Sequence, residues 1–500
     1  MDIMVFINML LQNTLIATII LGIFWIVKRL QERRVKAIPP GPMPLPFIGT
    51  LYKHAMFPLP YELNALSKHY GNIMSIRIGF KQVVVLSEIN IIQEALSMEA
   101  FANRGMADTY TFRLLCENNG LFRADYNQKM IKDRKHIMTS FQKLGVGKSL
   151  MEDVILREVS GISEYFNTLT ENTIDPSRII NLAIANIILH LIFDIRFDYN
   201  DADLQLITDG TTEITRDLYY ITAIDLLPIL QYLPPFRGFL RRWLKLARDL
   251  LHVGGKYVQF VIDRFEPGQE SCLADLWLQQ HYDCKDDSLK YDHGELTFLL
   301  VDLTIAGLET SAHTLKWFVI YITNRPALQQ KLFEEIRSNV GLSREVKISD
   351  KESLPLLQAT IQETQRMCNV VPLVLRQTNK TRDIQLHDYT IEKGTIILAN
   401  AVGVHNNVTT WKDPDVFRPE RFLSAGAKKV VPNRHMMPFG LGKRSCAGDI
   451  LAKQELFLIT SNLVQKFAFC LPEGKEEIDE RPLQGTFWVP RPYKINIKQR

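Results

Sequence analysis

Four stretches of this chain carry apolar residues at helical spacing. The longest covers 294–324, is apolar on almost every side and is closed by Pro326. A helix that is apolar all round is buried, so we expect this one to run through the interior. Helices are also predicted over 127–147, 356–367 and 449–464. Short β-branched runs at 74–78 and 82–87, on either side of Gly79, predict a hairpin.

The N-terminal apolar run, 3–27, carries no charge. As a helix it would span roughly 37 Å, enough to cross a bilayer core of ~30 Å. A cleaved signal peptide is the alternative, but it would have positive charge before the run and a small-residue cleavage site after it. Here Asp2 precedes the run and basic residues follow it, at Lys28, Arg29, Arg33, Arg34 and Lys36. We therefore expect an uncleaved anchor over 1–27, with the body on the cytosolic face.

Prolines dominate the segment that follows the basic cluster. Residues 38–49 read Ile-Pro-Pro-Gly-Pro-Met-Pro-Leu-Pro-Phe-Ile-Gly. Such a density of proline prevents a helix and gives a stiff, extended chain. We interpret 28–49 as a basic, proline-rich linker and 50–500 as the catalytic body, although a plain domain boundary would look similar.

Composition excludes several classes of protein. The 500 residues are 46% hydrophobic and 23% charged, with a net charge of +4. This balance gives no reason to expect nucleic acid as a partner. The six cysteines lie far apart without any Cys-x-x-Cys pair, so neither a disulfide scaffold nor a zinc framework is expected.

One cysteine stands in an unusual loop, Phe439 to Gly448, which reads Phe-Gly-Leu-Gly-Lys-Arg-Ser-Cys-Ala-Gly. Gly440 and Gly442 permit a tight turn, and Gly448 would allow close approach of a backbone or a flat ligand. Lys443 and Arg444 are expected to favour the thiolate of Cys446, as is the N-terminus of the helix predicted over 449–464. A buried, inert cysteine is the alternative for an isolated residue of this kind.

The middle of the long helix reads Ala306-Gly307-Leu308-Glu309-Thr310. The small pair Ala306 and Gly307 would let a ligand press against the helix backbone. Thr310 can bond the carbonyl one turn back and open the helix locally. An acid beside an alcohol can relay protons into an apolar cavity, although isolated residues of these types are more often capped core polar groups.

The cysteine loop resembles the haem-binding loop of the cytochrome P450 family, with Phe439, Gly442, Arg444, Cys446 and Gly448 at its spacing Phe-x-x-Gly-x-Arg-x-Cys-x-Gly. The resemblance implies that Cys446 is the axial thiolate of a haem b iron. The Ala306–Thr310 string resembles the family's Ala-Gly-x-Glu-Thr oxygen-activation motif, which implies proton delivery by Glu309 and Thr310.

Two further family motifs are present. Glu363 and Arg366 match the Glu-x-x-Arg pair, and Arg421 in Phe-Arg-Pro-Glu-Arg-Phe matches its third member. The resemblance implies a buried network that braces the cysteine loop. The approach to this third motif also matches the family, at Asn400, His405, Trp411 and Pro414.

The resemblance also implies residues that hold the haem propionates: Arg134, Arg376 and Arg444. Arg134 matches the second member of a Trp-x-x-x-Arg motif, but Met130 stands where the tryptophan is expected. A thioether cannot donate a hydrogen bond, so haem retention should depend more on the arginines. The proline usual before the position of Arg376 is missing, so the register could shift towards Gln377.

The implied fold is mainly α-helical with small β-sheets, preceded by one transmembrane helix in the endoplasmic reticulum membrane. The implied activity is monooxygenation of a lipophilic small molecule (a steroid, sesquiterpenoid, fatty acid or xenobiotic). Electrons would come from an NADPH-dependent flavoprotein reductase, docked near Lys132, Lys135 and Lys443, with cytochrome b5 as a second candidate donor. Residues 225–233 and 485–489 would line or roof the substrate cavity, or belong to the core. A reductase-independent haem-thiolate isomerase or dehydratase, and a non-catalytic membrane haem protein, are the alternatives.

Overall fold

The structure is a computed structural model that describes residues 37–46, 48–53, 60–105, 109–115, 120–169, 173–282, 292–426 and 429–500. The predicted anchor at 1–27 lies outside these residues. Within the described ranges, no helix combines the length and apolar character needed to cross a membrane.

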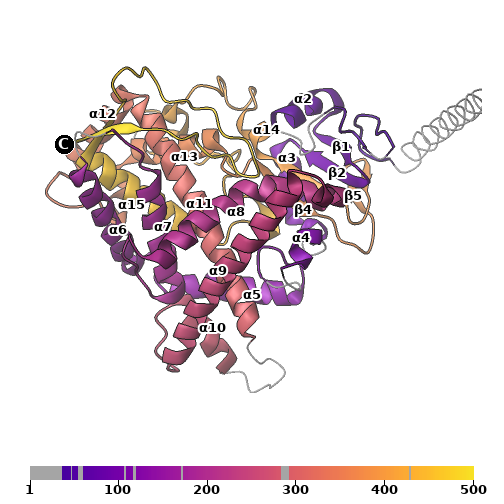
Figure 1. The fold of residues 1–500 in the computed structure, drawn as a ribbon. Helices are drawn as coiled ribbons and strands as arrows, with labels where there is room; N and C mark the ends of the chain where they lie inside the picture. Colours follow the sequence, from indigo (N-terminus) through magenta and orange to yellow (C-terminus); the bar gives the residue numbers. More distant parts are fainter. Residues whose placement is uncertain are drawn as a thin grey trace, which may run out of the picture.

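The long apolar pattern forms α11 (His293–Thr323), which runs through the molecule (Figure 1). Asp292 caps its start by accepting hydrogen bonds from the N–H groups of Gly294 and Glu295. It ends before Pro326, whose fixed φ instead opens the next helix, α12 (Pro326–Asn339). The prediction of a long interior helix is confirmed, because about three quarters of its residues are buried.

The helices packed against α11 include α7 (Ser177–Phe193), α8 (Ala202–Leu226), α9 (Phe236–Arg264), α13 (Pro355–Cys368) and α15 (Asp449–Lys466). Helix α5 (Gln128–Lys143) ends four residues before the predicted end at residue 147, because Gly145 and Gly147 adopt positive φ. The remaining α-helices are α2 (Pro60–Tyr70), α3 (Ile89–Ser97), α4 (Tyr110–Arg113), α6 (Ser149–Thr168), α10 (Leu273–Tyr282) and α14 (Ala401–His405).

The largest sheet has the strand order β1-β2-β7-β4. The predicted hairpin is confirmed, with β1 (Ile73–Ile78) antiparallel to β2 (Lys81–Leu86). Strand β7 (Ile396–Asn400) runs parallel to β2 and antiparallel to β4 (Leu373–Gln377). The smaller sheets contain β3 (Thr173–Ile174), β9 (Ile495–Gln499) and β8 (Phe467–Cys470), and β5 (Ile384–Leu386) with β6 (Tyr389–Ile391).

The mainly α-helical architecture with small sheets is therefore as predicted. The large sheet lies with α2 and α3 at one end of the molecule, and α6, α7, α12 and α15 lie at the other (Figure 1). Each end has its own apolar clusters, and the larger one is built on the helices. Strand β4 ends in Arg376 and Gln377, so the sheet carries polar side chains towards the middle of the molecule.

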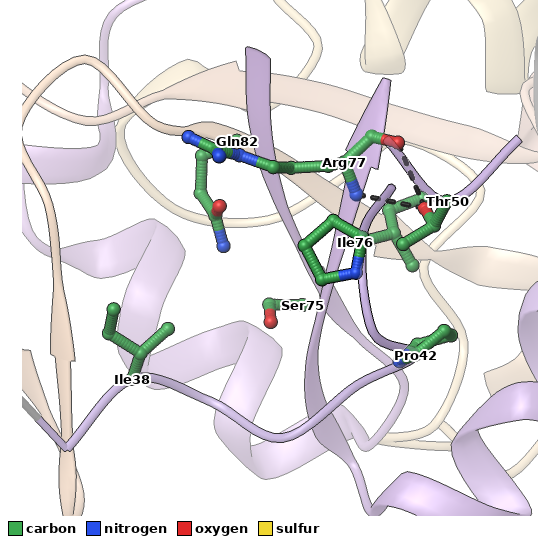
Figure 2. A pocket seen from close by; sticks show the side chains of 8 residues that line it. Ile38, Pro42, Thr50, Ser75, Ile76, Arg77 and Gln82 are labelled. Carbon is green, nitrogen blue, oxygen red and sulfur yellow. Dashed lines mark hydrogen bonds between the residues drawn. The ribbon is translucent and has the colours of Figure 1, made fainter. Parts of the chain in front are cut away.

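Part of the proline-rich segment is attached to β1. Ser75 donates from its N–H to Pro40 O and from its hydroxyl to Pro39 O, both at 2.7 Å. The contact is close, since a Cβ at Gly41 would lie 1.8 Å from Ser75 O. Thr50 and Arg77 exchange two bonds of 2.9 Å further along (Figure 2). Residues 38–46 and 48–50 therefore lie along the edge of the sheet.

Candidate active site

The cysteine loop is held by its own backbone and by α3. Gly440 and Gly442 have φ of 66° and 72°, which glycine adopts at little cost. A Cβ at Gly442 would lie 1.9 Å from Leu96 O, so a side chain has no room there. The Cys446 N–H donates to Phe439 O at 2.8 Å and closes the loop. Gly448 is the N-cap of α15, and open space surrounds the position of its missing Cβ.

Cys446 is exposed, although protein atoms crowd the sulfur on its other sides. Burial and the charge of Asp449 raise the pKa of its thiol, whereas the Gly448 N–H, Arg134 and Lys453 lower it. The pKa ends above its ordinary value, and Lys443 and Arg444, which were predicted to favour the thiolate, are not among the groups that lower it.

The reason is the direction in which those two cations point. Lys443 Nζ lies 3.9 Å from Glu99 Oε1, and the Arg444 guanidinium donates to the Ala124 carbonyl. Lys453, which does favour the thiolate, lies 5.0 Å from the centroid of the Phe439 ring. Deprotonation of the sulfur therefore needs a further positive charge, such as a metal ion.

Helix α11 presents Ala306 and Thr310 on one side. Ala306 is exposed although it lies in the middle of an interior helix, and Thr310 is half-buried. Gly307 does not share this side, because a Cβ there would lie 2.7 Å from Ile188 of α7. The small residue at Gly307 therefore allows α7 to pack closely against α11, and the predicted ligand contact at Gly307 stays a prediction.

Thr310 forms the predicted hydrogen bond, donating to Ala306 O at 2.8 Å. The helix does not open, however, because residues 293–323 remain α-helical throughout. A threonine hydroxyl can bond the carbonyl one turn back without breaking the helical ladder, since that oxygen has a second lone pair.

Glu309 points away from Thr310, towards α8. Its carboxylate accepts hydrogen bonds from Thr212 (2.9 Å), Thr215 (3.2 Å) and His313 Nε2 (2.9 Å). Burial raises the pKa of Glu309, but the hydrogen bond and charge of His313, the charge of Lys316 and the Thr212 hydroxyl together lower it below its ordinary value. The predicted acid and alcohol are neighbours in the chain but occupy different faces of α11.

The predicted arginines lie around the cysteine loop. Arg134 donates to Ser445 O at 2.6 Å, and Arg376 donates to Arg444 O at 3.0 Å. Burial and the charges of Arg444 and Arg134 lower the pKa of Arg376 to about 9. Burial and Arg134 lower the pKa of Arg444 to about 10. Gln377 instead donates to Gly394 O, so Arg376 is the residue that joins this group.

A fourth arginine, Arg104, was not predicted. Its guanidinium lies 4.8 Å from the centroid of the Phe122 ring, and burial together with the charges of Arg376, Arg444 and Arg134 lowers its pKa well below the ordinary value. It follows η1 (Glu99–Phe101) in an irregular segment, where neither helical nor strand periodicity singles out a residue.

These four residues, which we call the arginine cluster, suit an anionic ligand. None of them forms an ion pair with a carboxylate of the described residues, and the Nε atoms of Arg104 and Arg444 are buried without a hydrogen-bond partner there. The cluster lies beside the exposed thiol of Cys446, since Arg134 and Arg376 donate to the carbonyls of Ser445 and Arg444. A flat apolar group with two carboxylates, such as haem, fits this donor set.

A second group of charges, which we call the paired network, lies behind the loop. Arg366 binds Glu363 through bonds of 2.7 and 2.9 Å, and Arg421 Nε donates to Glu363 Oε1 at 3.0 Å. Arg366 also donates to the carbonyls of His405 and Pro414, both at 2.8 Å. Glu363 and Arg366 are completely buried, and each of the three nitrogen atoms of the Arg366 guanidinium group has a hydrogen-bond partner.

His405 connects this network to the cysteine loop. Met437 N–H donates to His405 Nε2 at 3.0 Å, so the ring proton is on Nδ1, which donates to Asn369 Oδ1 at 2.7 Å. Burial and the charge of Arg366 lower the pKa of His405 to about 3. The sequence marked His405 only as part of a motif, whereas the structure shows a neutral imidazole between α13 and the loop.

The remaining predicted positions lie in different environments. Met130 is buried on α5, one turn before Arg134. Trp488 belongs to the core. Its backbone N–H donates to Val370 O, and the centroid of its ring lies 5.2 Å from that of the Tyr61 ring. In the 225–233 segment, Asp225 is buried and accepts from Thr111, while Tyr232 is 70% exposed.

Comparison with known proteins agrees with this geometry. The family model for Cytochrome P450 matches residues 39–497. Cytochrome P450 2U1 of Rattus norvegicus is 30% identical over 94% of this chain and 92% of its own length. Cytochrome P450 2J5 of Mus musculus is 31% identical over 97% and 95%, and Cytochrome P450 2J2 of Homo sapiens is 32% identical over 89% and 88%. The chain belongs to the cytochrome P450 family and is an oxidoreductase of the monooxygenase class.

Proposed function

We propose that this chain inserts one oxygen atom from O2 into a lipophilic small molecule, with electrons that NADPH supplies through a flavoprotein reductase. The observation that carries the proposal is the exposed thiol of Cys446, with the arginine cluster beside it. A steroid, a sesquiterpenoid, a fatty acid and a xenobiotic remain candidate substrates, and their shared property is apolar surface.

In this proposal, Cys446 is the iron ligand, and Arg104, Arg134, Arg376 and Arg444 hold the propionates. A haem bound through a thiolate supplies the chemistry that cleaves dioxygen. The Gly448 N–H and Arg134 stabilise the negative charge on the sulfur. Two anionic groups among these four arginines would relieve the repulsion that lowers the pKa values of Arg104, Arg376 and Arg444.

The protein's own groups would handle protons and water. The Thr310 hydroxyl lies next to the exposed Ala306 and donates to Ala306 O, so it would have to turn from that carbonyl to donate to a polar group bound there. The Glu309 carboxylate lies on another side of the same helical turn, where it accepts three hydrogen bonds. We propose that Thr310 is the final proton donor and that Glu309 resupplies it.

The proposed partners follow from charge and from the N-terminal sequence. Lys132, Lys135 and Lys443 are exposed around the cysteine loop and α5, and an acidic reductase or cytochrome b5 would be attracted there. The uncharged run and the basic residues after it support a single anchor over 1–27 in the endoplasmic reticulum membrane, with linker 28–49 and catalytic body 50–500 on the cytosolic face.

The first experiment tests the thiolate. Purified protein should give a reduced, CO-bound difference spectrum typical of thiolate ligation, and Cys446→Ser should abolish it. Lipophiles are then screened for spin-state shifts, and those that bind are tested for product with NADPH and reductase. Thr310→Ala should release more peroxide per NADPH, and unchanged coupling would refute its role as the proton donor. Product formed without reductase would instead favour an isomerase or dehydratase, and binding without product a non-catalytic haem protein.

A further inference from the structure

Three titratable side chains lie one after another on the buried side of α11. Glu309, His313 and Lys316 are four and three residues apart, so they share a face of the helix. Their exposed fractions are 1%, 5% and 5%. Buried ionisable groups need charge partners or hydrogen bonds, and a row of three in one helix exceeds what the packing of α11 requires.

The contacts within the row are specific. His313 Nε2 lies 2.9 Å from Glu309 Oε2, while Thr212 and Thr215 of α8 donate to the same carboxylate. His313 Nδ1 is buried and has no hydrogen-bond partner among the described residues. A histidine with one nitrogen bonded to an acid and the other unengaged can accept a proton on one side while it gives one up on the other.

The charges around His313 favour its neutral form. Burial and the charge of Lys316 lower its pKa, while Glu309 raises it, and the pKa ends below its ordinary value. The Glu309 carboxylate accepts hydrogen bonds from two threonine hydroxyls of α8, those of Thr212 and Thr215. Asp175, in the exposed segment before α7, attracts Lys316, and Tyr493 donates to the Lys316 carbonyl at 3.1 Å. Of the three side chains in the row, Lys316 is the one on which the charge of the exposed Asp175 acts.

We propose that His313 is a proton relay that resupplies Glu309, and that Lys316 and Asp175 mark the side from which protons enter. The inference rests on the proposed function, in which Glu309 and Thr310 deliver protons. In the step, the His313 Nε2–H bond breaks and a Glu309 Oε2–H bond forms. A proton from water on the Lys316 side adds to Nδ1, so the imidazole stays neutral and its two nitrogens exchange roles.

Two substitutions separate relay from positioning. His313→Ala removes both functions, whereas the amide of His313→Gln can still donate to Glu309 but cannot exchange a proton between two nitrogens. Full-length protein is reconstituted with reductase in lipid vesicles, and laurate is the probe. We expect both variants to release about 10-fold more peroxide per NADPH consumed than the wild type, which is less than the roughly 10²–10⁴-fold effect of losing a direct acid–base catalyst.

Peroxide-driven laurate hydroxylation supplies its own protons with the oxidant, so both variants should keep it. Thr323→Val is the matched control, since Thr323 is a buried residue of α11 whose hydroxyl donates to Val319 O, and its coupling should match the wild type. Wild-type coupling in His313→Gln would overturn the relay and leave His313 as a positioning residue. A wild-type protein that binds haem but consumes no NADPH with reductase would overturn the proposed function, and the relay with it.

Discussion

The paired network and the arginine cluster both place guanidinium groups near the cysteine loop, but of the two only the paired network, among the described residues, contains a carboxylate that pairs with them. In the paired network, Glu363 lies between Arg366 and Arg421, and main-chain carbonyls accept the remaining hydrogen bonds. In the arginine cluster, the charges repel one another and two Nε atoms have no described partner. A complete set of partners indicates a structural role, and an incomplete set indicates a place for a ligand.

The largest test of this comparison removes the carboxylate of the paired network. Glu363→Ala should destabilise the protein by about 3–5 kcal/mol, because two buried guanidinium groups lose their counter-charge. Urea unfolding followed by circular dichroism measures the change. Glu363→Gln, which keeps the shape and part of the hydrogen bonding, should cost less. A loss below about 1 kcal/mol in Glu363→Ala would mean that the network is not a brace.

A substitution in the arginine cluster should have the opposite effect on the stability of the haem-free protein. Without haem, Arg376→Gln should leave stability unchanged or raise it, because one of several repelling charges is removed. With haem, the same change should weaken retention by about 10-fold or more, the value of a lost charge-assisted hydrogen bond of roughly 1.5–3 kcal/mol. Haem transfer to an acceptor protein measures retention. Equal destabilisation of both forms would show that Arg376 is a structural residue.

His405, which contacts the paired network, should make the stability of the protein depend on pH. Its pKa is about 3 in the folded protein and ordinary, near 6.5, when unfolded. Between these pH values His405 is protonated in the unfolded chain but neutral in the folded protein. The free energy of unfolding should therefore fall as the pH drops below about 6.5. The slope is about 1.4 kcal/mol per pH unit at most. His405→Gln should unfold with a shallower dependence between pH 7 and 5, and parallel curves for the two proteins would contradict this.

The smallest expected effect concerns Met130, one turn before Arg134. Met130→Trp adds an indole N–H and should slow haem loss a few-fold. The larger side chain should at the same time cost about 1–3 kcal/mol in the free energy of unfolding, which offsets part of the gain. Met130→Leu is the matched control, because it keeps the volume and adds no donor. An unchanged rate of haem loss in Met130→Trp would show that retention does not depend on a donor at this position.

Helix boundaries were the most predictable part of the fold. Asp292 and Pro326 fix the two ends of α11 chemically, so the predicted 294–324 differs from the structure by one residue at each end. Helices α8 and α9 were not predicted, although each exceeds twenty residues. Prolines at 228, 234 and 235 punctuate that region, and the polar positions of α8 mask its helical repeat.

The direction of individual side chains was the least predictable part of the site. Spacing identified Gly307, Glu309 and Thr310 as one motif, yet they face α7, α8 and the open side respectively. Which neighbour each meets depends on how α11 is rotated in the body, and that is set by packing distant in sequence. The same reason explains Lys443 and Arg444, whose targets Glu99 and Ala124 lie more than 300 residues away.

With the proposed anchor over 1–27, the attachment of residues 38–46 and 48–50 to the edge of β1 would limit how far the body can move from the membrane. An anchor ending at residue 27 would leave ten residues before Ile38, and a fully extended chain of that length reaches about 35 Å. A globule of this size is roughly 60 Å across, so the tether is shorter than the body it holds. The corner of the molecule that carries β1 would stay close to the lipid surface, and lipophiles dissolved in the bilayer would meet that side first.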